Sequence, residues 1–174
     1  MSGDWERDFV DYVGARSHVL RNTAYLLCGD WHRAEDLTQI ALAKLYVVWR
    51  RIGHQESVDG YARQVLVRTF LDERRRPWRR EHVAAELTDR PAAADPVDDR
   101  VDLLAALRRL PRTQRAAVVL RYWADLSVAE TAAALGIREG TVKSASSRGL
   151  SVLREVLQGS RPGEPAPDPA MTRE

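Results

Sequence analysis

Seven polar and basic residues near the carboxyl end of the chain recur at the spacing of one helical face. They are Arg138, Glu139, Thr141, Lys143, Ser144, Ser147 and Arg148. Cations bind phosphates, and short polar side chains form hydrogen bonds with base edges. The pattern therefore indicates a contact with nucleic acid, although the solvated face of an ordinary helical hairpin has the same composition.

The preceding residues predict how this face is held. Ser127 and Glu130 have the spacing of a capping box, and Gly136 suits the end of the helix that Ser127 begins. A second helix is expected from about Glu139 to Leu157. Two helices around a tight turn form a helix-turn-helix, whose second helix enters the major groove of DNA.

Small residues suit such a motif because they let two helices approach closely. Ala129, Ala132 and Ala133 are expected at that contact. Larger apolar residues are expected to supply a compact core: Leu135, Ile137, Val142, Leu150 and Leu153.

The rest of the chain also has helical spacing, with no convincing run of period two. An apolar stripe from Trp5 to Leu27 predicts a helix that ends at Gly29, and Asp30 suits the cap of the next one. A third helix is expected from about Ser57, stopping before Pro77.

Two further helices are expected before the helix-turn-helix. One covers Asp102 to Leu110, and the next has Pro111 at its first position and extends through Trp123. The predicted fold is all-α, with two small helical domains at residues 1–82 and 99–158. A flexible acidic linker over residues 83–98 joins them, and residues 159–174, rich in proline, are expected to be a disordered tail.

Charge is distributed unevenly along the 174 residues, although the net charge is only +2. Residues 68–82 and residues 138–154 each carry a net charge of +3, whereas residues 86–102 carry −4. Two basic segments separated by an acidic one suggest two polyanion contacts. Cys28 is the only cysteine, which excludes an intramolecular disulfide and suits a reducing cytosol. No apolar run reaches the length of about 18 residues that a membrane span needs, so a cytoplasmic location is expected.

Several motifs together resemble bacterial RNA polymerase sigma factors of the extracytoplasmic-function (ECF) type. LPRTQR, LRYWADLS and GTVKSASSR resemble region 4 of these proteins, while GDWHRAEDLTQIALAKLY and GYARQVLVRTFLDERRR resemble region 2. The resemblance implies a promoter-specificity subunit that binds core polymerase and recognises the −35 and −10 promoter elements. It implies no catalysis, cofactor or metal.

Contacts with the polymerase are implied at two places. Glu35, Asp36 and Gln39 lie on a polar helical face that the resemblance places on the clamp helices of the largest subunit. A second set is implied at the flap of the second-largest subunit: Arg112, Gln114 and Arg115. An anti-sigma factor is a possible further partner, and no membrane contact is expected.

The resemblance also implies a −10 contact that captures an unstacked base. Its candidate residues lie in the loop after Gly53 and on the helix that follows: His54, Gln55, Glu56, Ser57, Tyr61, Arg63, Arg68, Asp72, Arg75 and Arg76. Tyr61 has two interpretations, support for that loop or simple core. The acidic linker also has two, an electrostatic mimic of RNA in the polymerase channel or a plain tether.

Two other classes of protein compete with this interpretation. A stand-alone helix-turn-helix regulator would need a dimer or a sensor pocket to reach useful specificity. An enzyme would need a recognised catalytic or metal-binding spacing. His32, Glu35 and Asp36 could share a helical face as metal ligands, but no HExxH motif or phosphate-binding loop accompanies them.

Overall fold

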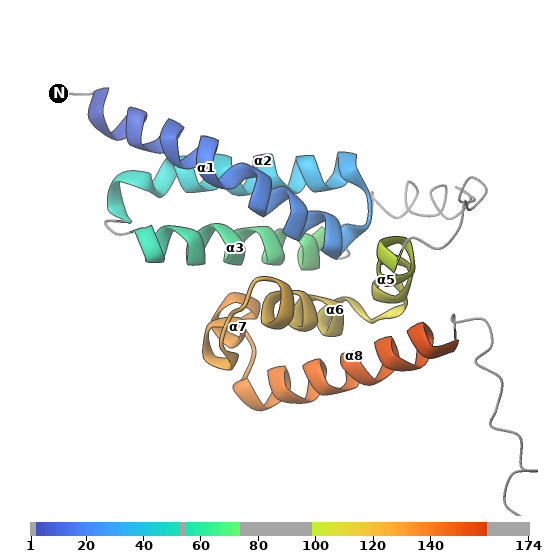
Figure 1. The fold of residues 1–174 in the computed structure, drawn as a ribbon. Coiled ribbons are helices and arrows are strands. Elements are labelled where there is room, and N and C mark those ends of the chain that lie inside the picture. Colours follow the sequence, from blue (N-terminus) through green and yellow to red (C-terminus); the bar gives the residue numbers. More distant parts are fainter. Residues whose placement is uncertain (1–2, 53–54, 74–98, 160–174) are drawn as a thin grey trace, which may run out of the picture.

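The computed structural model describes residues 3–52, 55–73 and 99–159, and every regular element in these ranges is helical (Figure 1). An amino-terminal half contains α1 (Gly3–Cys28), α2 (Trp31–Val48), the 3-10 turn η1 (Trp49–Arg51) and α3 (Gln55–Asp72). A carboxyl-terminal half contains α5 (Asp99–Arg109), α6 (Arg112–Val118), the π-helical turn η5 (Val119–Trp123), α7 (Val128–Leu135) and α8 (Glu139–Gly159). The predicted all-α class is confirmed.

The turn between α1 and α2 forms as the sequence predicts. Gly29 has a φ of 75°, and its N–H donates to the Tyr25 carbonyl at 2.7 Å, which ends α1. Asp30 then caps α2, since its carboxylate accepts from the Arg33 N–H at 2.7 Å. Local backbone chemistry is sufficient to specify this corner.

The helix boundaries differ from the prediction at three places. The third helix begins at Gln55, and α5 begins at Asp99. Pro111 lies outside the first turn of α6, with φ −53° and ψ 144°, and its carbonyl accepts from the Arg115 N–H at 2.9 Å. Proline at this position leaves no helical hydrogen bond unmade because it has no N–H to donate.

The helix expected to run through Trp123 is not a regular α-helix to its end, because it widens into η5. The Ala124 N–H donates to the Val119 carbonyl at 3.0 Å, and the Leu126 N–H donates to the Leu120 carbonyl, also at 3.0 Å. Leu120 and Leu126 are both buried. The wider turn therefore lets the chain leave the helix with both leucines inside the core.

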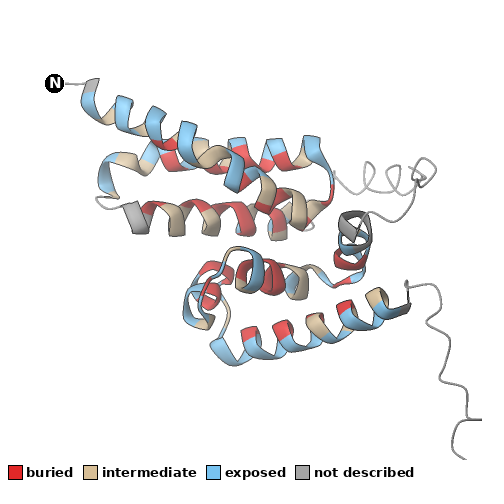
Figure 2. Cartoon of the chain, viewed as in Figure 1, coloured by how far each residue is buried: buried red, intermediate tan, exposed pale blue. Residues whose placement is uncertain are grey.

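The two halves share one continuous apolar core, which two separate domains on a tether would not require. Leu27, Leu37, Leu66 and Phe70 of the amino-terminal half belong to the same buried cluster as Leu120 of the carboxyl-terminal half. In Figure 2 α3 lies between α2 and the carboxyl-terminal half, and it carries buried residues of both the shared core and the amino-terminal half. A second, smaller cluster lies within the amino-terminal half: Tyr12, Leu20, Leu45, Val58 and Ala62.

The predicted linker at residues 83–98 and the predicted tail at residues 159–174 lie outside the described residues, except for Gly159, which is the last residue of α8. In the described ranges, no helix has the length and apolar character needed to cross a membrane.

Candidate nucleic-acid interface

The helix-turn-helix forms from α7 and α8, with the predicted caps. The Ser127 side chain accepts from the Glu130 N–H at 3.1 Å, and Glu130 accepts from the Ser127 N–H at 2.7 Å. Gly136 has a φ of 67° and ends α7. The Arg138 carbonyl accepts from the N–H groups of Thr141 and Val142, so α8 begins directly after the turn. This geometry fixes the direction of α8 relative to α7.

The closest approach between helices of the carboxyl-terminal half does not lie at the alanines where it was predicted. Ala132 is buried, but Ala129 and Ala133 are exposed. The tight contact lies at Gly149, where a Cβ would stand 2.7 Å from Cγ2 of Val118 on α6. The prediction was therefore wrong for two of the three alanines, because α8 packs most closely on α6 and not on α7.

The outer face of α8 is open along the part that was predicted to contact DNA. All seven predicted −35 residues are exposed: Arg138, Glu139, Thr141, Lys143, Ser144, Ser147 and Arg148. Underneath them, Val142 is fully buried and Leu153 is nearly so, which fixes the rotation of the helix. Leu135 is also buried, while Ile137 and Leu150 are half-buried, so the predicted compact core is present.

A pocket of about 310 Å³ lies beside this face and adds two cations that were not among the predicted DNA contacts. Arg121 and Arg154 line it together with Lys143, and no acidic residue lines it. The three cations are far apart in sequence, and the packing of α8 against α6, which continues into η5, brings them to one pocket. Helical spacing along α8 could have placed Arg154 on the same side as Lys143, but it could not have predicted that Arg121 lies nearby.

The predicted polymerase face on α2 is exposed. Glu35, Asp36 and Gln39 are all accessible, and Glu35 lies 3.6 Å from a guanidinium nitrogen of Arg21. Trp31 belongs to the same surface, being one turn before Glu35 and 49% exposed. Its ring stacks on Tyr25 at 3.8 Å, and Arg21 lies over it at 5.5 Å.

Trp31 was not among the contact residues predicted from the sequence. Its position in the sequence could have indicated a contact residue, because Trp31 directly follows the helix cap Asp30 and precedes Glu35 by one helical turn. Aromatic residues dominate the energetics of many protein interfaces.

The predicted −10 residues differ in how exposed they are, and some of them lie outside the described residues. Arg63, Arg68 and Asp72 lie on α3, where Arg68 and Asp72 are exposed and Arg63 lies 3.7 Å from Asp59. Tyr61 is half-buried and packs against both core clusters, which favours the core interpretation.

Part of the predicted base-capturing loop is helical. Gln55, Glu56 and Ser57 form the first turn of α3, so the loop after Gly53 is shorter than expected. Acidic and polar residues suit a helix amino terminus, whose N–H groups carry partial positive charge. His54, Arg75 and Arg76 lie outside the described residues.

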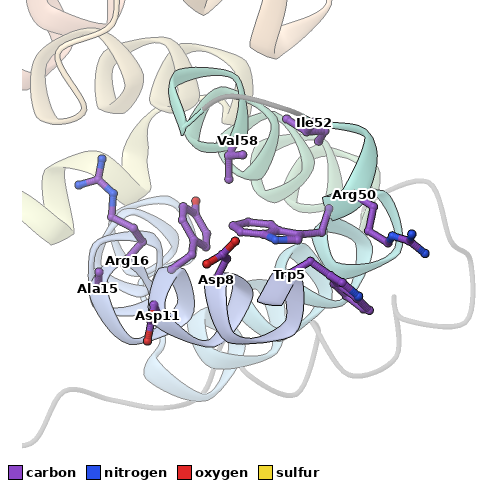
Figure 3. Close-up of a pocket in the computed structure, with 10 residues that line it drawn as sticks. Trp5, Asp8, Asp11, Ala15, Arg16, Arg50, Ile52 and Val58 are labelled. Carbon is purple, nitrogen blue, oxygen red and sulfur yellow. The ribbon is translucent and has the colours of Figure 1, made fainter. Parts of the chain in front are cut away.

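The start of α3 is fastened to α1 by Asp59. Its carboxylate accepts from the Tyr12 hydroxyl at 2.9 Å and from Nε of Arg16 at 3.2 Å, with a second contact to the Arg16 guanidinium. Burial, followed by the hydrogen bond to Asp59, raises the pKa of Tyr12. A pocket of about 590 Å³ opens beside this network, and Trp5 and Arg50 lie at one end of it (Figure 3).

The predicted flap-contact residues on α6 do not form an open surface. Arg112, Gln114 and Arg115 are each half-buried. Arg115 donates to the Leu27 carbonyl of α1 at 2.7 Å, and Arg112 donates to the Phe70 carbonyl of α3. The structure brings the two arginines together at the boundary between the halves.

Other buried or reactive groups offer little chemistry. Burial raises the pKa of the Cys28 thiol, whose Sγ lies 3.2 Å from the Asp30 carbonyl. Among the described residues, no group of three His, Cys, Asp or Glu side chains is placed to hold a metal ion.

Both halves match known protein families. Residues 13–80 match the model of sigma-70 region 2, and residues 100–153 match that of sigma-70 region 4. The RNA polymerase sigma-E factor of Streptomyces coelicolor is 38% identical over 157 residues, covering 86% of each chain. The ECF RNA polymerase sigma factor SigM of Mycobacterium tuberculosis is 34% identical over 156 residues, covering 87% of this chain and 79% of that one.

A solved structure agrees in fold and length. It is that of the sigma factor RpoE in complex with the anti-sigma factor NepR from Bartonella quintana, which aligns with a TM-score of 0.71 and 27% identity. The alignment covers 89% of this chain and 99% of that one. The chain therefore belongs to the sigma-70 family, and within it to the ECF sigma factors. It is a promoter-specificity subunit of bacterial RNA polymerase.

Proposed function

We propose that three surfaces divide the work of promoter recognition in this chain. The exposed face of α8 reads the −35 element, α3 with the loop before it contacts the −10 element, and the α2 face docks on the clamp helices of the largest polymerase subunit. The observation that carries the proposal is the outer face of α8, where all seven predicted side chains are exposed. Val142, which is fully buried beneath them, fixes the rotation of the helix.

Each helical surface suits its proposed partner. Lys143 and Arg148 supply the charge for phosphate contacts, while Ser144 and Ser147 are short enough to approach base edges. On α2, Asp36 and Gln39 provide polar contacts beside Trp31, which supplies a large apolar anchor. Arg63 and Arg68 give α3 the positive charge that a DNA strand requires.

The stand-alone regulator is the less favoured function, because both halves match sigma regions and not only the helix-turn-helix. Bond formation belongs to the polymerase, and this chain supplies promoter choice in the cytoplasm, where the polymerase works. An anti-sigma factor is a further possible partner, in keeping with the complex in which the RpoE neighbour was solved.

Run-off transcription with sigma-free core polymerase on a library of promoter fragments tests this division. The chain is expected to produce discrete start sites. Asp36→Ala/Gln39→Ala should abolish them by preventing core binding, and Lys44→Ala, an exposed change on the same helix, should not.

A second pair of variants separates DNA recognition from docking. Lys143→Ala/Ser144→Ala should keep core binding while losing promoter-specific transcripts. Loss of core binding in that variant would contradict the proposed separation of the two surfaces.

A further inference from the structure

The pocket of about 310 Å³ beside α8, which we call the cationic pocket, has a composition that favours an anion. Arg121, Lys143 and Arg154 supply three positive charges to its lining, and no lining residue is acidic. The remaining lining residues are neutral: Tyr122, Val128, Ser146, Ser147 and Leu150. A concave site lined by charges of one sign concentrates counter-ions of the other sign.

The three cations of the pocket are not neutralised within the part of the chain that the structure describes. Lys143 and Arg154 are exposed, and neither they nor Arg121 forms an ion pair there. Arg121 is held in place because a guanidinium nitrogen donates to the Leu126 carbonyl. Its guanidinium carbon also lies 5.8 Å from the centre of the Tyr122 ring. Arg121 is therefore positioned at the pocket and keeps further N–H donors for a ligand.

Ser146 is a second and independent sign of a ligand. The residue is 5% exposed, and its Oγ has no hydrogen-bond partner among the described residues. Buried hydroxyls usually have a partner, because burial removes the hydrogen bonds that water supplies in the unfolded chain. Rotation about the Cα–Cβ bond moves Oγ between staggered positions. Because Ser146 lines the cationic pocket, an anion bound there can accept the missing hydrogen bond.

The size and lining of the pocket suit a molecule larger than a single phosphate. Pockets that hold small organic ligands have volumes from about 300 Å³ upward. Lys143 and Arg154 are about three turns apart on α8, or about 16 Å along its axis. Val128 and Leu150 add apolar surface, and the Tyr122 ring, with the residue 56% exposed, is open to stacking by a planar group.

A backbone phosphate of DNA is the competing source of the anion. The proposed −35 residues begin at Arg138, so the first turns of α8 are those that enter the major groove. Arg154 lies about 24 Å further along the helix axis. The major groove is only about 12 Å wide and about 8.5 Å deep. One end of the cationic pocket therefore lies beyond the groove, which favours a free ligand over DNA.

We propose that the cationic pocket binds a phosphorylated small molecule that also carries a planar group, a ligand of the nucleotide class. Its phosphates contact the three cations and the Ser146 hydroxyl, and its planar group lies against the Tyr122 ring. The site depends only on residues that line the pocket. Its existence does not rest on the proposed function of the chain.

Occupancy of the pocket opposes binding of the −35 element, and this consequence does rest on the proposed function. Lys143 and Ser147 belong both to the pocket and to the proposed −35 face. A phosphate that neutralises Lys143 removes a contact that DNA would otherwise use. The ligand therefore lowers the affinity for the −35 duplex by the same factor by which the duplex lowers the affinity for the ligand.

Isothermal titration calorimetry of the whole chain tests the site without DNA or polymerase. The probe is ADP in the absence of divalent cations, with pyrophosphate and adenosine as its two separate parts. We expect saturable binding of one ADP, and at least about fivefold weaker binding of each part, because each lacks the contacts of the other. No saturable binding of ADP would overturn the proposal. Pyrophosphate that binds as tightly as ADP would overturn the nucleotide class.

Ser146→Ala is the most informative variant, because it removes a hydroxyl that has no partner in the free chain. Its Tm should be unchanged or higher, while its affinity for ADP should fall at least about fivefold. Ser151→Ala, a serine of the same helix that does not line the pocket, should bind ADP as the unchanged chain does. Equal ADP affinity of the two serine variants would overturn the role of the Ser146 hydroxyl.

A matched pair of charge variants separates the pocket from net charge. Arg154→Gln should also weaken ADP binding at least about fivefold, since it removes a charged donor from the pocket. Arg109→Gln removes an exposed arginine of α5 that does not line the pocket, and it should stay within about twofold. An equal loss in both variants would show that net charge alone attracts the probe, and would overturn the site.

Fluorescence anisotropy with a −35 duplex distinguishes the two sources of phosphate. ADP at ten times its Kd should weaken duplex binding at least about fivefold, beyond the effect of sodium chloride at equal ionic strength. Ser146→Ala should bind the duplex within about twofold and lose most of this response to ADP. If Ser146→Ala itself weakened duplex binding about fivefold, the pocket would hold a DNA phosphate and the free ligand would be excluded. Binding of ADP by a chain that binds no −35 duplex would contradict the proposed function and support the site.

Discussion

Arg115 on α6 donates to the carbonyl of Leu27 on α1 at 2.7 Å, although 88 residues separate them. The same guanidinium donates to the Arg108 carbonyl at 2.8 Å and to the Leu110 carbonyl at 3.2 Å. One side chain thus joins α5, α6 and α1. Burial, and then the charges of Arg112 and Arg108, lower the pKa of Arg115 to about 10, so these carbonyls must offset the cost of a half-buried cation.

Arg115→Lys should destabilise the chain despite keeping the charge. A lysine ammonium cannot match the planar guanidinium, which reaches three carbonyls at once. The expected loss is about 2 kcal/mol, or a fall in Tm of about 4–8 °C, by differential scanning calorimetry. Arg109→Lys on the exposed side of α5 is the control. A Tm for Arg115→Lys equal to that of the control would contradict the three-carbonyl role.

Gly149→Ala should destabilise the carboxyl-terminal half. The new methyl group would stand 2.7 Å from Cγ2 of the buried Val118, and overpacking of this kind costs about 1–3 kcal/mol. The gain in helix propensity from glycine to alanine, about 0.5–1 kcal/mol, offsets only part of that cost. Urea denaturation monitored by circular dichroism measures the difference.

Gly140→Ala is the matched comparison in the same helix. Beyond the adjacent backbone of its own helix, no atom lies within 4 Å of a Cβ at Gly140, so helix propensity alone acts there and stability should rise slightly. If the two alanine variants shifted the urea midpoint in the same direction, the close approach at Gly149 would not control the packing of α8.

The correct sequence predictions concern chemistry confined to a few adjacent residues. Gly29 and Asp30 at one corner, and Ser127 with Glu130 at another, satisfy backbone groups within one helical turn. Such signals do not depend on what packs nearby. The exposed faces of α2 and α8 were also predictable, because helical periodicity separates their polar and apolar sides.

The features that could not be predicted from the sequence are contacts between distant segments of the chain. Nothing in the sequence around Arg115 indicates its contact with the Leu27 carbonyl of α1, because that contact depends on how the two halves pack. Nothing in the sequence around Gly149 indicates that Val118 lies against it. The π-helical turn at Val119 likewise follows from burying Leu126, a tertiary requirement.

Ser127→Ala should lower stability by about 1 kcal/mol, because it removes the side-chain acceptor of the capping box at the start of α7. Thermal denaturation should show this loss as a lower Tm. Ser151→Ala, which replaces an exposed serine within α8, should leave the Tm unchanged. An equal Tm for the two variants would show that the cap contributes nothing to the folded state.

The capping box also predicts a pH dependence. Hydrogen bonding with the Ser127 side chain, and then with its backbone N–H, lowers the pKa of Glu130. The stabilisation from a lowered carboxyl pKa is complete above the ordinary glutamate pKa and is lost as the pH falls through the folded value. An NMR titration should therefore give Glu130 a lower pKa in the native chain than in Ser127→Ala. Identical titration curves would contradict the capping interaction.

Lys143→Gln should weaken binding to a −35 duplex by a similar factor on matched and mismatched sequences. Lys143 is exposed beside the pocket that also contains Arg121 and Arg154, and a phosphate contact there carries no sequence information. Losing one such contact should reduce the slope of log K against log salt by about 0.9. Fluorescence anisotropy over a series of salt concentrations measures this slope, with Arg109→Gln as the charge-matched control. An unchanged slope would remove Lys143 from the phosphate contacts, and a slope changed equally by the control would show that the loss of net charge alone is responsible.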